Sequence, residues 1–223
     1  LDPSKDGRLP TILSCTRMLQ GKRADTPVIG NLVGALSLAS SLIDAVTLYK
    51  ELLLDPAEVR GMLDFLTENC IAYGEALIDN GADVIAIADP SATGEILGPR
   101  LFKEFVLPYL NRMIAAMHAR GIPVIVHICG DIRPVYKPLA MLDADCLSVD
   151  SVVSMRDARK ALPAKKLMGN VSTGILQKGP SPLIEKLSKD LLNTVDILAP
   201  ACGISAKTPV VHLRAMTETA KRS

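Results

Sequence analysis

The chain has 223 residues, of which 48% are hydrophobic, so it is long and apolar enough to bury a sizeable core as one large domain or two small ones. Its 25 Lys and Arg residues against 24 Asp and Glu residues give a net charge of +1, and only 3% of its residues are aromatic, which argues against a nucleic-acid-binding or membrane-surface protein. Five scattered cysteines, no signal-peptide pattern and apolar runs too short to span a bilayer lead us to expect a reduced, cytoplasmic protein.

Six short apolar segments recur along the chain, and each is followed by a segment with helical features. They are rich in Val, Ile and Leu and nearly continuous in hydrophobicity, which is typical of strands that are buried on both faces, as in a parallel sheet. The predicted strands lie within residues 26–34, 82–90, 122–130, 145–153, 166–174 and 196–204.

Helix-start signals appear in the segments between these strands. "DPAEV" offers Asp55 as the N-cap, Pro56 at the first helical position and Glu58 as the returning carboxylate. The apolar residues that follow recur at helical spacing and predict one helix over 55–79 with a single buried face. The same cap-then-proline pattern predicts further helix starts within 98–102, 181–185 and 208–212.

The regular alternation of strand and helix predicts an α/β fold with a parallel sheet and right-handed crossovers. Two architectures fit this pattern, an open doubly wound sheet and a (β/α)8 TIM-type barrel. No G-x-G-x-x-G motif follows the first predicted strand, which disfavours the dinucleotide-binding form of the open sheet. A complete barrel usually takes about 250 residues, so a barrel with only six visible units would lack two of them.

The stretch "PVIVHICGD", residues 123–131, is an apolar strand that ends in an imidazole and a thiol. His127 and Cys129 share one face, because side chains alternate along a strand, and both lie at the carboxyl end, where active sites form in parallel α/β folds. Cys202, in "APACG", ends the last predicted strand in the same way. In a barrel the three side chains would converge at one mouth, and such a donor set is typical of catalytic zinc with an open fourth position.

A second interpretation of these residues stays open at this point. His127 is then a hydrogen-bonded core histidine, and the two cysteines are small buried hydrophobic residues. The remaining histidines and cysteines carry weaker signals. We expect surface positions for His118 and His212 and core positions for Cys15, Cys70 and Cys146.

Polar residues also close other predicted strands, namely Asp89, Asp150 and Asn170. A single carboxylate at a strand end is often only a helix cap, but three polar residues around one mouth predict a pocket. Asp150 or Glu95 is expected to supply an oxygen ligand or to orient His127 from behind, and the sequence does not choose between them.

Three stretches of the chain together resemble the uroporphyrinogen decarboxylase superfamily. They are "GADVIAIADPSATGEILGPRLFKEFVLPYL", "PVIVHICGD" and "APACGI" with "TPVVHLRAM". More narrowly they resemble its corrinoid-dependent branch, the methylcobalamin:coenzyme M methyltransferases, which carry H-x-C on one strand and a distant C-G on the last. The resemblance covers nearly the whole chain, starting at "DGRLPTIL".

This resemblance implies a (β/α)8 barrel with zinc at the C-terminal mouth, held by His127, Cys129 and Cys202. It also implies that the first two strands and an N-terminal helical extension are absent here. Residues 1–223 are then expected to be a single, incomplete barrel domain, the C-terminal two-thirds of a longer protein.

The resemblance further implies a zinc-dependent methyltransferase, which moves a methyl group from methylcobalamin on a separate corrinoid protein to a small thiol such as coenzyme M. Asp89, Ser91, Asp150 and Asn170 are expected to bind the substrate. No nucleic-acid or membrane partner is expected. Two other interpretations remain, a porphyrinogen decarboxylase that needs no metal and a non-catalytic barrel fragment that binds a corrinoid protein.

Overall fold

Six parallel strands form one sheet in the computed structural model, which describes residues 1–22 and 25–222. The strands are β1 (Ile29–Val33), β2 (Val84–Ala88), β3 (Val124–Ile128), β4 (Cys146–Val149), β5 (Lys166–Val171) and β6 (Ile197–Pro200). All six predicted strands are therefore confirmed, each inside its predicted segment.

Helices fill the connections between the strands. They are α1 (Leu9–Gln20), α2 (Ala35–Leu42), α3 (Ala45–Leu54), α4 (Pro56–Asp79), α5 (Gly94–Phe105), α6 (Leu107–Ala119), α7 (Tyr136–Leu139), α8 (Met155–Ala161), α9 (Thr173–Lys178), α10 (Ser181–Leu192) and α11 (Val210–Lys221), with 3-10 turns η1 (Pro90–Ala92) and η2 (Arg133–Val135). Within the described ranges, no helix combines the length and the apolar character needed to cross a lipid bilayer.

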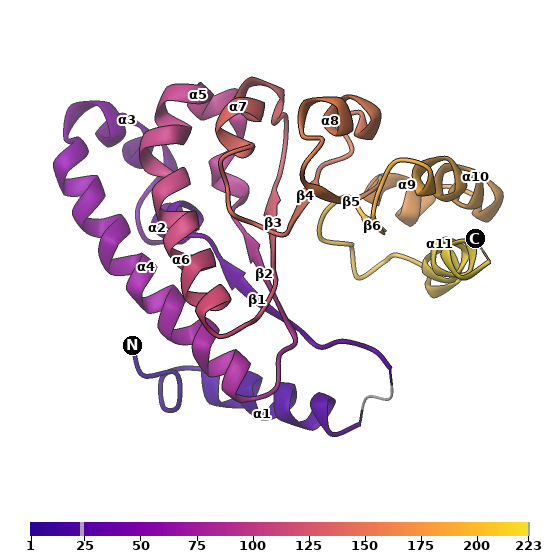
Figure 1. The fold of residues 1–223 in the computed structure, drawn as a ribbon, viewed down its shortest axis with the longest axis horizontal. Coiled ribbons are helices and arrows are strands. Elements are labelled where there is room, and N and C mark those ends of the chain that lie inside the picture. Colours follow the sequence, from indigo (N-terminus) through magenta and orange to yellow (C-terminus); the bar gives the residue numbers. More distant parts are fainter. Residues whose placement is uncertain (23–24, 223) are drawn as a thin grey trace.

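The strand order decides between the two architectures that the sequence leaves open. A doubly wound sheet reverses its order at a switch point and carries helices on both faces. Here the order runs from β1 to β6 without reversal, so right-handed crossovers place the helices on one face only. Figure 1 shows α2, α4 and α6 stacked on one side of β1 to β3. The fold is an α/β half-barrel of the TIM type, as predicted, with β1 and β6 at its edges.

Local sequence signals explain where several helices begin. The Asp55 carboxylate accepts a hydrogen bond from the N–H of Glu58 and starts α4 as predicted. The prolines at 180 and 209 are themselves the N-caps of α10 and α11, and neither helix has the side-chain cap that the sequence predicts. In α5, Gly98 takes a φ of 61° and kinks the chain before the helix resumes at Pro99, because glycine adopts positive φ without a Cβ clash.

Most buried apolar side chains form one cluster between the outer face of the sheet and its helices. A second, smaller cluster joins β5 to α9, α10 and α11, which Figure 1 shows at the far end of the sheet from α4. Cys70 and Cys146 are buried as predicted, but Cys15 is exposed on α1, so its predicted core position is wrong. The edge strands expose apolar side chains, with Ile29 48% and Ile197 42% accessible.

Three aspartates tie the strands into pairs at their N-terminal ends. Each aspartate directly precedes an even-numbered strand and makes two hydrogen bonds to one residue at the start of the strand before it. The aspartate side chain accepts a hydrogen bond from the N–H of that residue, and the N–H of the aspartate donates to the carbonyl of the same residue. The pairs are Asp83 with Val28, Asp145 with Val124 and Asp196 with Leu167, with side-chain distances of 2.8, 2.7 and 2.9 Å. The same pair of hydrogen bonds therefore recurs between β1 and β2, between β3 and β4, and between β5 and β6.

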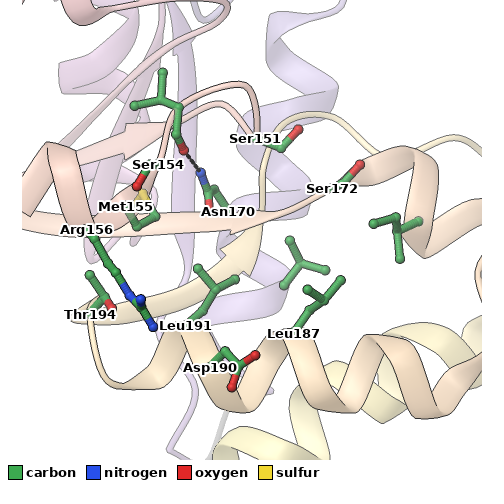
Figure 2. Close-up of a pocket in the computed structure, with 13 residues that line it drawn as sticks. Ser151, Ser154, Met155, Arg156, Asn170, Ser172, Leu187, Asp190, Leu191 and Thr194 are labelled. Atoms are coloured by element: carbon green, nitrogen blue, oxygen red, sulfur yellow. Dashed lines mark hydrogen bonds between the residues drawn. The ribbon is translucent and has the colours of Figure 1, made fainter.

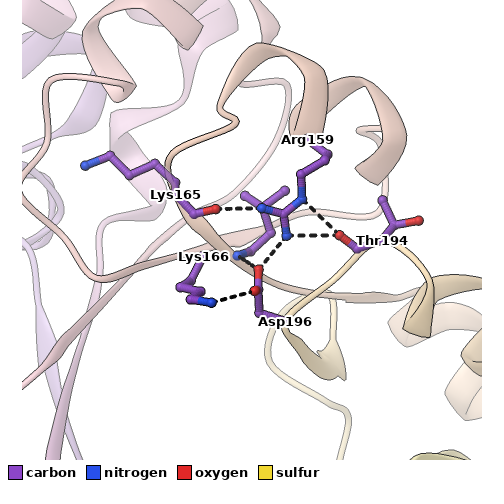
Figure 3. A network of polar contacts seen from close by, with 6 residues as sticks. Arg159, Lys165, Lys166, Thr194 and Asp196 are labelled. Carbon is purple, nitrogen blue, oxygen red and sulfur yellow. Dashed lines mark hydrogen bonds and ion pairs between the residues drawn. The ribbon is translucent and has the colours of Figure 1, made fainter. Parts of the chain in front are cut away.

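Around Asp196 these hydrogen bonds are part of a larger polar network (Figure 3). The Arg159 guanidinium pairs with Asp196 and donates to the carbonyls of Lys165 and Thr194, while the Lys166 ammonium lies 3.1 Å from the same carboxylate. Burial alone would raise the pKa of Asp196, but the backbone N–H and the two cations lower it to about 2. The network fixes α8, β5 and β6 together at the N-terminal ends of these strands.

Candidate metal centre and active site

The three residues singled out from the sequence lie on two distant strand ends. β3 buries Val126 and Ile128 on its outer face, and therefore turns His127 to the inner face, where the imidazole is half-buried. Cys129 is the first residue after β3 and is half-buried. Cys202 follows the last residue of β6 by two positions and is exposed.

These three side chains come together although β3 and β6 are separated by β4 and β5. In a flat sheet three strand spacings would place the two strands about 14 Å apart. Instead the Cys129 Sγ lies 3.4 Å from the Cys202 Sγ and 3.1 Å from the His127 Nε2. All three donor atoms lie within 4.8 Å of one another. The curl of the sheet and the turn after β6 together produce this cluster.

The donor set fits a zinc ion in number, chemistry and spacing. Ligand atoms bound tetrahedrally at about 2.0–2.3 Å from one zinc lie roughly 3.5–3.8 Å apart. Two separations here are slightly shorter, at 3.1 and 3.4 Å, and all three donor atoms lie within 4.8 Å of one another. Burial lowers the pKa of His127, which favours the neutral imidazole that a metal requires. Burial and the nearby Cys202 raise the pKa of Cys129 to about 12, so the thiol needs a cation beside it to ionise at neutral pH.

Ser148 on β4 is a site residue that sequence reasoning missed. Its Oγ lies 3.0 Å from the His127 Nδ1, so the other ring nitrogen, Nε2, faces the sulfur atoms. Ser148 is only 8% exposed and stands directly beside His127 in the β3–β4 register. The sequence predicts Asp150 or Glu95 in this position behind the imidazole, whereas the hydrogen-bond partner of Nδ1 is Ser148. A serine within the otherwise apolar strand that follows β3 was the signal in the sequence that could have pointed to this contact.

Asp150 and Asn170 support the loop that carries Cys129. The Asp150 carboxylate accepts a hydrogen bond from the N–H of Gly130, at 3.1 Å. The Asn170 amide in turn donates to the main-chain carbonyls of Asp150 and Val153, both at 2.9 Å. Their predicted role in binding substrate stays a prediction, and their contacts fix backbone next to a candidate ligand.

Glu95 is an exposed residue that also lies against this loop. Gly130 has a φ of +73°, and a Cβ built at this position would lie 2.9 Å from the Glu95 Oε1 and 2.7 Å from the Thr93 Oγ1. A side chain at 130 would therefore collide with the segment that enters α5. The carboxylate of Glu95 thus lies beside the residue that follows Cys129.

Asp89 and Ser91, predicted to bind substrate, belong to a network between β2 and α2. Asp89 is 1% exposed, and its Oδ1 accepts hydrogen bonds from both the N–H and the hydroxyl of Ser37. The Ser37 hydroxyl accepts the N–H of Ser91, whose own hydroxyl lies 2.8 Å from that of Ser40. A Cβ at position 34 would lie 2.2 Å from the Asp89 Oδ2, so only a glycine at this position leaves room for the carboxylate.

A hollow of about 450 Å³ opens on the inner face directly beside the His–Cys–Cys cluster. Two alanines on β2, Ala86 and Ala88, leave room in its floor, and Ala88 lies next to His127 in the strand register. The other lining residues are Ile29, Asn31, Ile125, His127, Ser148, Met168, Pro200, Cys202, Gly203 and Ile204. A small molecule in this hollow would lie mainly against apolar side chains.

A second hollow of about 450 Å³ lies on the helical side of the sheet (Figure 2). It opens between α8, α9 and α10, and Figure 2 shows Leu187 and Leu191 of α10 facing the end of β5, where Asn170 lies. Asn170 therefore lines this outer hollow and is not among the residues that line the inner one.

Comparison with known proteins gives a consistent result. The family model described as "Uroporphyrinogen decarboxylase (URO-D)" matches residues 1–223. The chain is 34% identical over 221 residues to the methylcobamide:CoM methyltransferase MtbA of Methanosarcina mazei, covering 96% of this chain. It is 32% identical over 214 residues to the methylcobamide:CoM methyltransferase MtaA of Methanosarcina barkeri, covering 94% of this chain.

A solved structure, described as a methyltransferase from Methanosarcina mazei, superposes with a TM-score of 0.92 at 29% sequence identity. The match covers 98% of this chain and 66% of that one. The chain likewise spans 64% of the length of MtbA and 62% of that of MtaA.

Asp89 generates a prediction for the pH dependence of stability. Burial raises its pKa from 3.8 to about 6, so the folded state holds this proton more tightly than the unfolded chain does. Below about pH 4, where the carboxyl group is protonated in both states, it does not change the free energy of unfolding. Above about pH 6 its ionisation lowers the free energy of unfolding by about 3 kcal/mol. We expect Asp89→Asn to remove this cost, so that urea unfolding shows the variant gaining stability relative to the wild type as the pH rises from 4 to 7.

The control for this measurement is Asp44→Asn. Asp44 is an exposed N-cap whose pKa is lowered by the N–H and hydroxyl of Thr47, so its effect falls below this pH window. Parallel pH profiles of the Asp89 variant and the wild type would show that the buried carboxyl group does not carry the assigned cost.

Proposed function

The chain belongs to the uroporphyrinogen decarboxylase family, and from that premise we propose that it is a zinc-dependent methyltransferase. In this proposal a methyl group moves from a methylated corrinoid, carried by a partner protein, to a thiol such as coenzyme M. His127, Cys129 and Cys202 are proposed to hold the zinc ion.

One observation carries the proposal, namely the convergence of three zinc-type donor atoms within 4.8 Å at the carboxyl ends of the strands. That end is where the active sites of TIM-type barrels form. Three protein donors leave a fourth position free for a substrate, which is the pattern of catalytic rather than structural zinc. Relatives at 32–34% identity that are named methylcobamide:CoM methyltransferases support the same reaction.

Each residue of the site has a defined task in this proposal. The Ser148 hydroxyl accepts a hydrogen bond from the protonated Nδ1 of His127, and this bond keeps Nε2 directed toward the sulfur atoms. Asp150 holds the backbone of Gly130, and with it the direction of Cys129. The inner hollow over Ala86 and Ala88 receives the carbon chain of the acceptor thiol, so that the mouth stays open to the corrinoid.

The chemical problem is that a free thiol, with a pKa near 8.5, is mostly protonated at neutral pH and therefore weakly nucleophilic. Zinc bound by these residues would supply the positive charge that removes this proton and keeps the acceptor sulfur as a thiolate. The thiolate sulfur attacks the methyl carbon of the methyl-cobalt(III) corrinoid. The sulfur–carbon bond forms as the cobalt–carbon bond breaks, and the electron pair of that bond stays on cobalt as cobalt(I).

The metal content of the purified chain tests the proposal most directly. We expect about one zinc per chain in the wild type by elemental analysis, and loss of stoichiometric zinc in Cys202→Ala, because two donors are too few for a stable site. Cys15→Ala, which removes an exposed thiol on α1, is the control and should keep its zinc. Full zinc retention by Cys202→Ala would refute the assigned site, and a metal-free, active wild type would favour a decarboxylase.

Ser148→Ala tests the orientation of the imidazole. Loss of the hydroxyl leaves Nδ1 without its partner, and we expect zinc affinity to fall by about 10- to 100-fold in competition with a chromophoric chelator. Ser148→Thr, which keeps a hydroxyl group, should restore most of the affinity. Equal affinities for the wild type and the Ala variant would show that Ser148 does not position the ligand.

Ala86→Leu tests where the acceptor lies. The larger side chain fills the floor of the inner hollow at the level of Ile125, two residues before His127 in the strand register. We therefore expect an unchanged zinc content and a KM for the thiol raised by about tenfold or more in methylcobalamin demethylation. Ala86→Ser, which keeps the small volume, serves as the size control. An unchanged KM in the Leu variant would place the acceptor elsewhere.

A further inference from the structure

We infer that Cys129 and Cys202 form a reversible intramolecular disulfide when no cation lies between them, which makes the site an oxidation-sensitive switch. The inference starts from the contact between the two sulfur atoms. It rests on the proposed zinc site only for the claim that bound metal protects the pair.

The geometry places the two sulfur atoms within reach of bond formation. Their separation of 3.4 Å must shorten to the disulfide length of about 2.05 Å. Cys202 lies in the irregular segment after β6 and is followed by exposed Gly203, where a built Cβ meets no atom within 4 Å. This segment has the open space to let Cys202 approach Cys129, while Cys129 follows directly from a central strand.

The other cysteines are placed differently. Cys70 and Cys146 are buried, and Cys15 is exposed on α1. In the part of the chain that the structure describes, which includes all five cysteines, Cys129 and Cys202 are the only two whose sulfur atoms are in contact. An oxidant from solvent can therefore reach either exposed thiol, Cys15 or Cys202, but of these two only Cys202 has a second thiol beside it.

The oxidation can be written as two balanced steps with a peroxide as the oxidant. The Cys202 sulfur attacks hydrogen peroxide, the O–O bond breaks, and a sulfenic acid and one water form. In the second step the Cys129 sulfur attacks the Cys202 sulfur while its proton passes to the departing hydroxyl group, so no free Cys129 thiolate is required; the S–S bond forms and a second water leaves. Two thiols lose two electrons in total, and the peroxide accepts them.

The consequence for the site is loss of both sulfur donors at once. A disulfide offers neither thiolate to a cation, so the oxidised chain should not bind zinc until a dithiol reductant reopens the bond. A bound cation would occupy both sulfur atoms and hold them apart, so the loaded protein should resist the same oxidant.

The test treats the chelator-stripped chain and the zinc-loaded chain with equimolar hydrogen peroxide. For the stripped chain we expect a mass lower by two hydrogens, loss of two of the five titratable thiols, and a proteolytic fragment pair linking Cys129 to Cys202. Dithiothreitol should restore both thiols and the binding of added zinc. The zinc-loaded chain should keep all five thiols over the same period.

Matched variants keep the result specific. Cys129→Ser and Cys202→Ser should each abolish the linked fragment, and Cys15→Ser, which removes another exposed thiol, should leave it unchanged. Linkage through Cys15, or sulfinic acid at Cys202 without any disulfide, would overturn the inference. Zinc binding is measured separately on the reduced chain. If the reduced chain binds zinc but oxidation gives no disulfide, only this inference fails, and if oxidation gives the disulfide but the reduced chain binds no zinc, only the proposed metal site fails.

Discussion

The curl of a sheet whose parallel strands follow chain order brings the ends of β3 and β6 together, and the candidate site depends on this curl before any side-chain chemistry begins. Unreversed order with right-handed crossovers sends the helices that connect the strands to one face and leaves the other face free to bend inward. In a flat sheet the same two strands would stand about 14 Å apart, and a motif of one imidazole and two thiols would have no common centre. The small side chains of Ala86 and Ala88 keep the inner face open beside this centre.

The elements that the sequence predicted well are those whose signals are local. Buried strands appear as apolar runs, α4 begins at its own N-cap, and the shared face of His127 and Cys129 follows from strand alternation. The features that escaped prediction depend on other segments. Ser148 meets His127 only because of the β3–β4 register, and Asp89 is drawn into the protein by Ser37, which lies 52 residues earlier.

The two halves of the candidate site differ in how firmly they are held. His127 lies on a central strand that is packed against the main hydrophobic cluster, and Cys129 directly follows this strand. Cys202 follows an edge strand, beside the smaller cluster formed by β5 and α9 to α11. A cation that binds all three residues favours the conformations in which both halves are in place, so its binding free energy would also stabilise the end of the half-barrel.

Under the proposed function, this unequal burial is what a site that accepts a thiol requires. If both sulfur atoms were enclosed in the core, an oxidant would not reach them, but neither would an acceptor thiol that has to approach the fourth position of the metal. Cys202 is exposed and borders the inner hollow, so a route that would admit the proposed substrate would also admit a peroxide. The sulfur atoms that are proposed to hold a soft cation are also open to oxidation when no cation binds them. The exposure of Cys202 therefore leaves the candidate site open both to an acceptor thiol and to an oxidant.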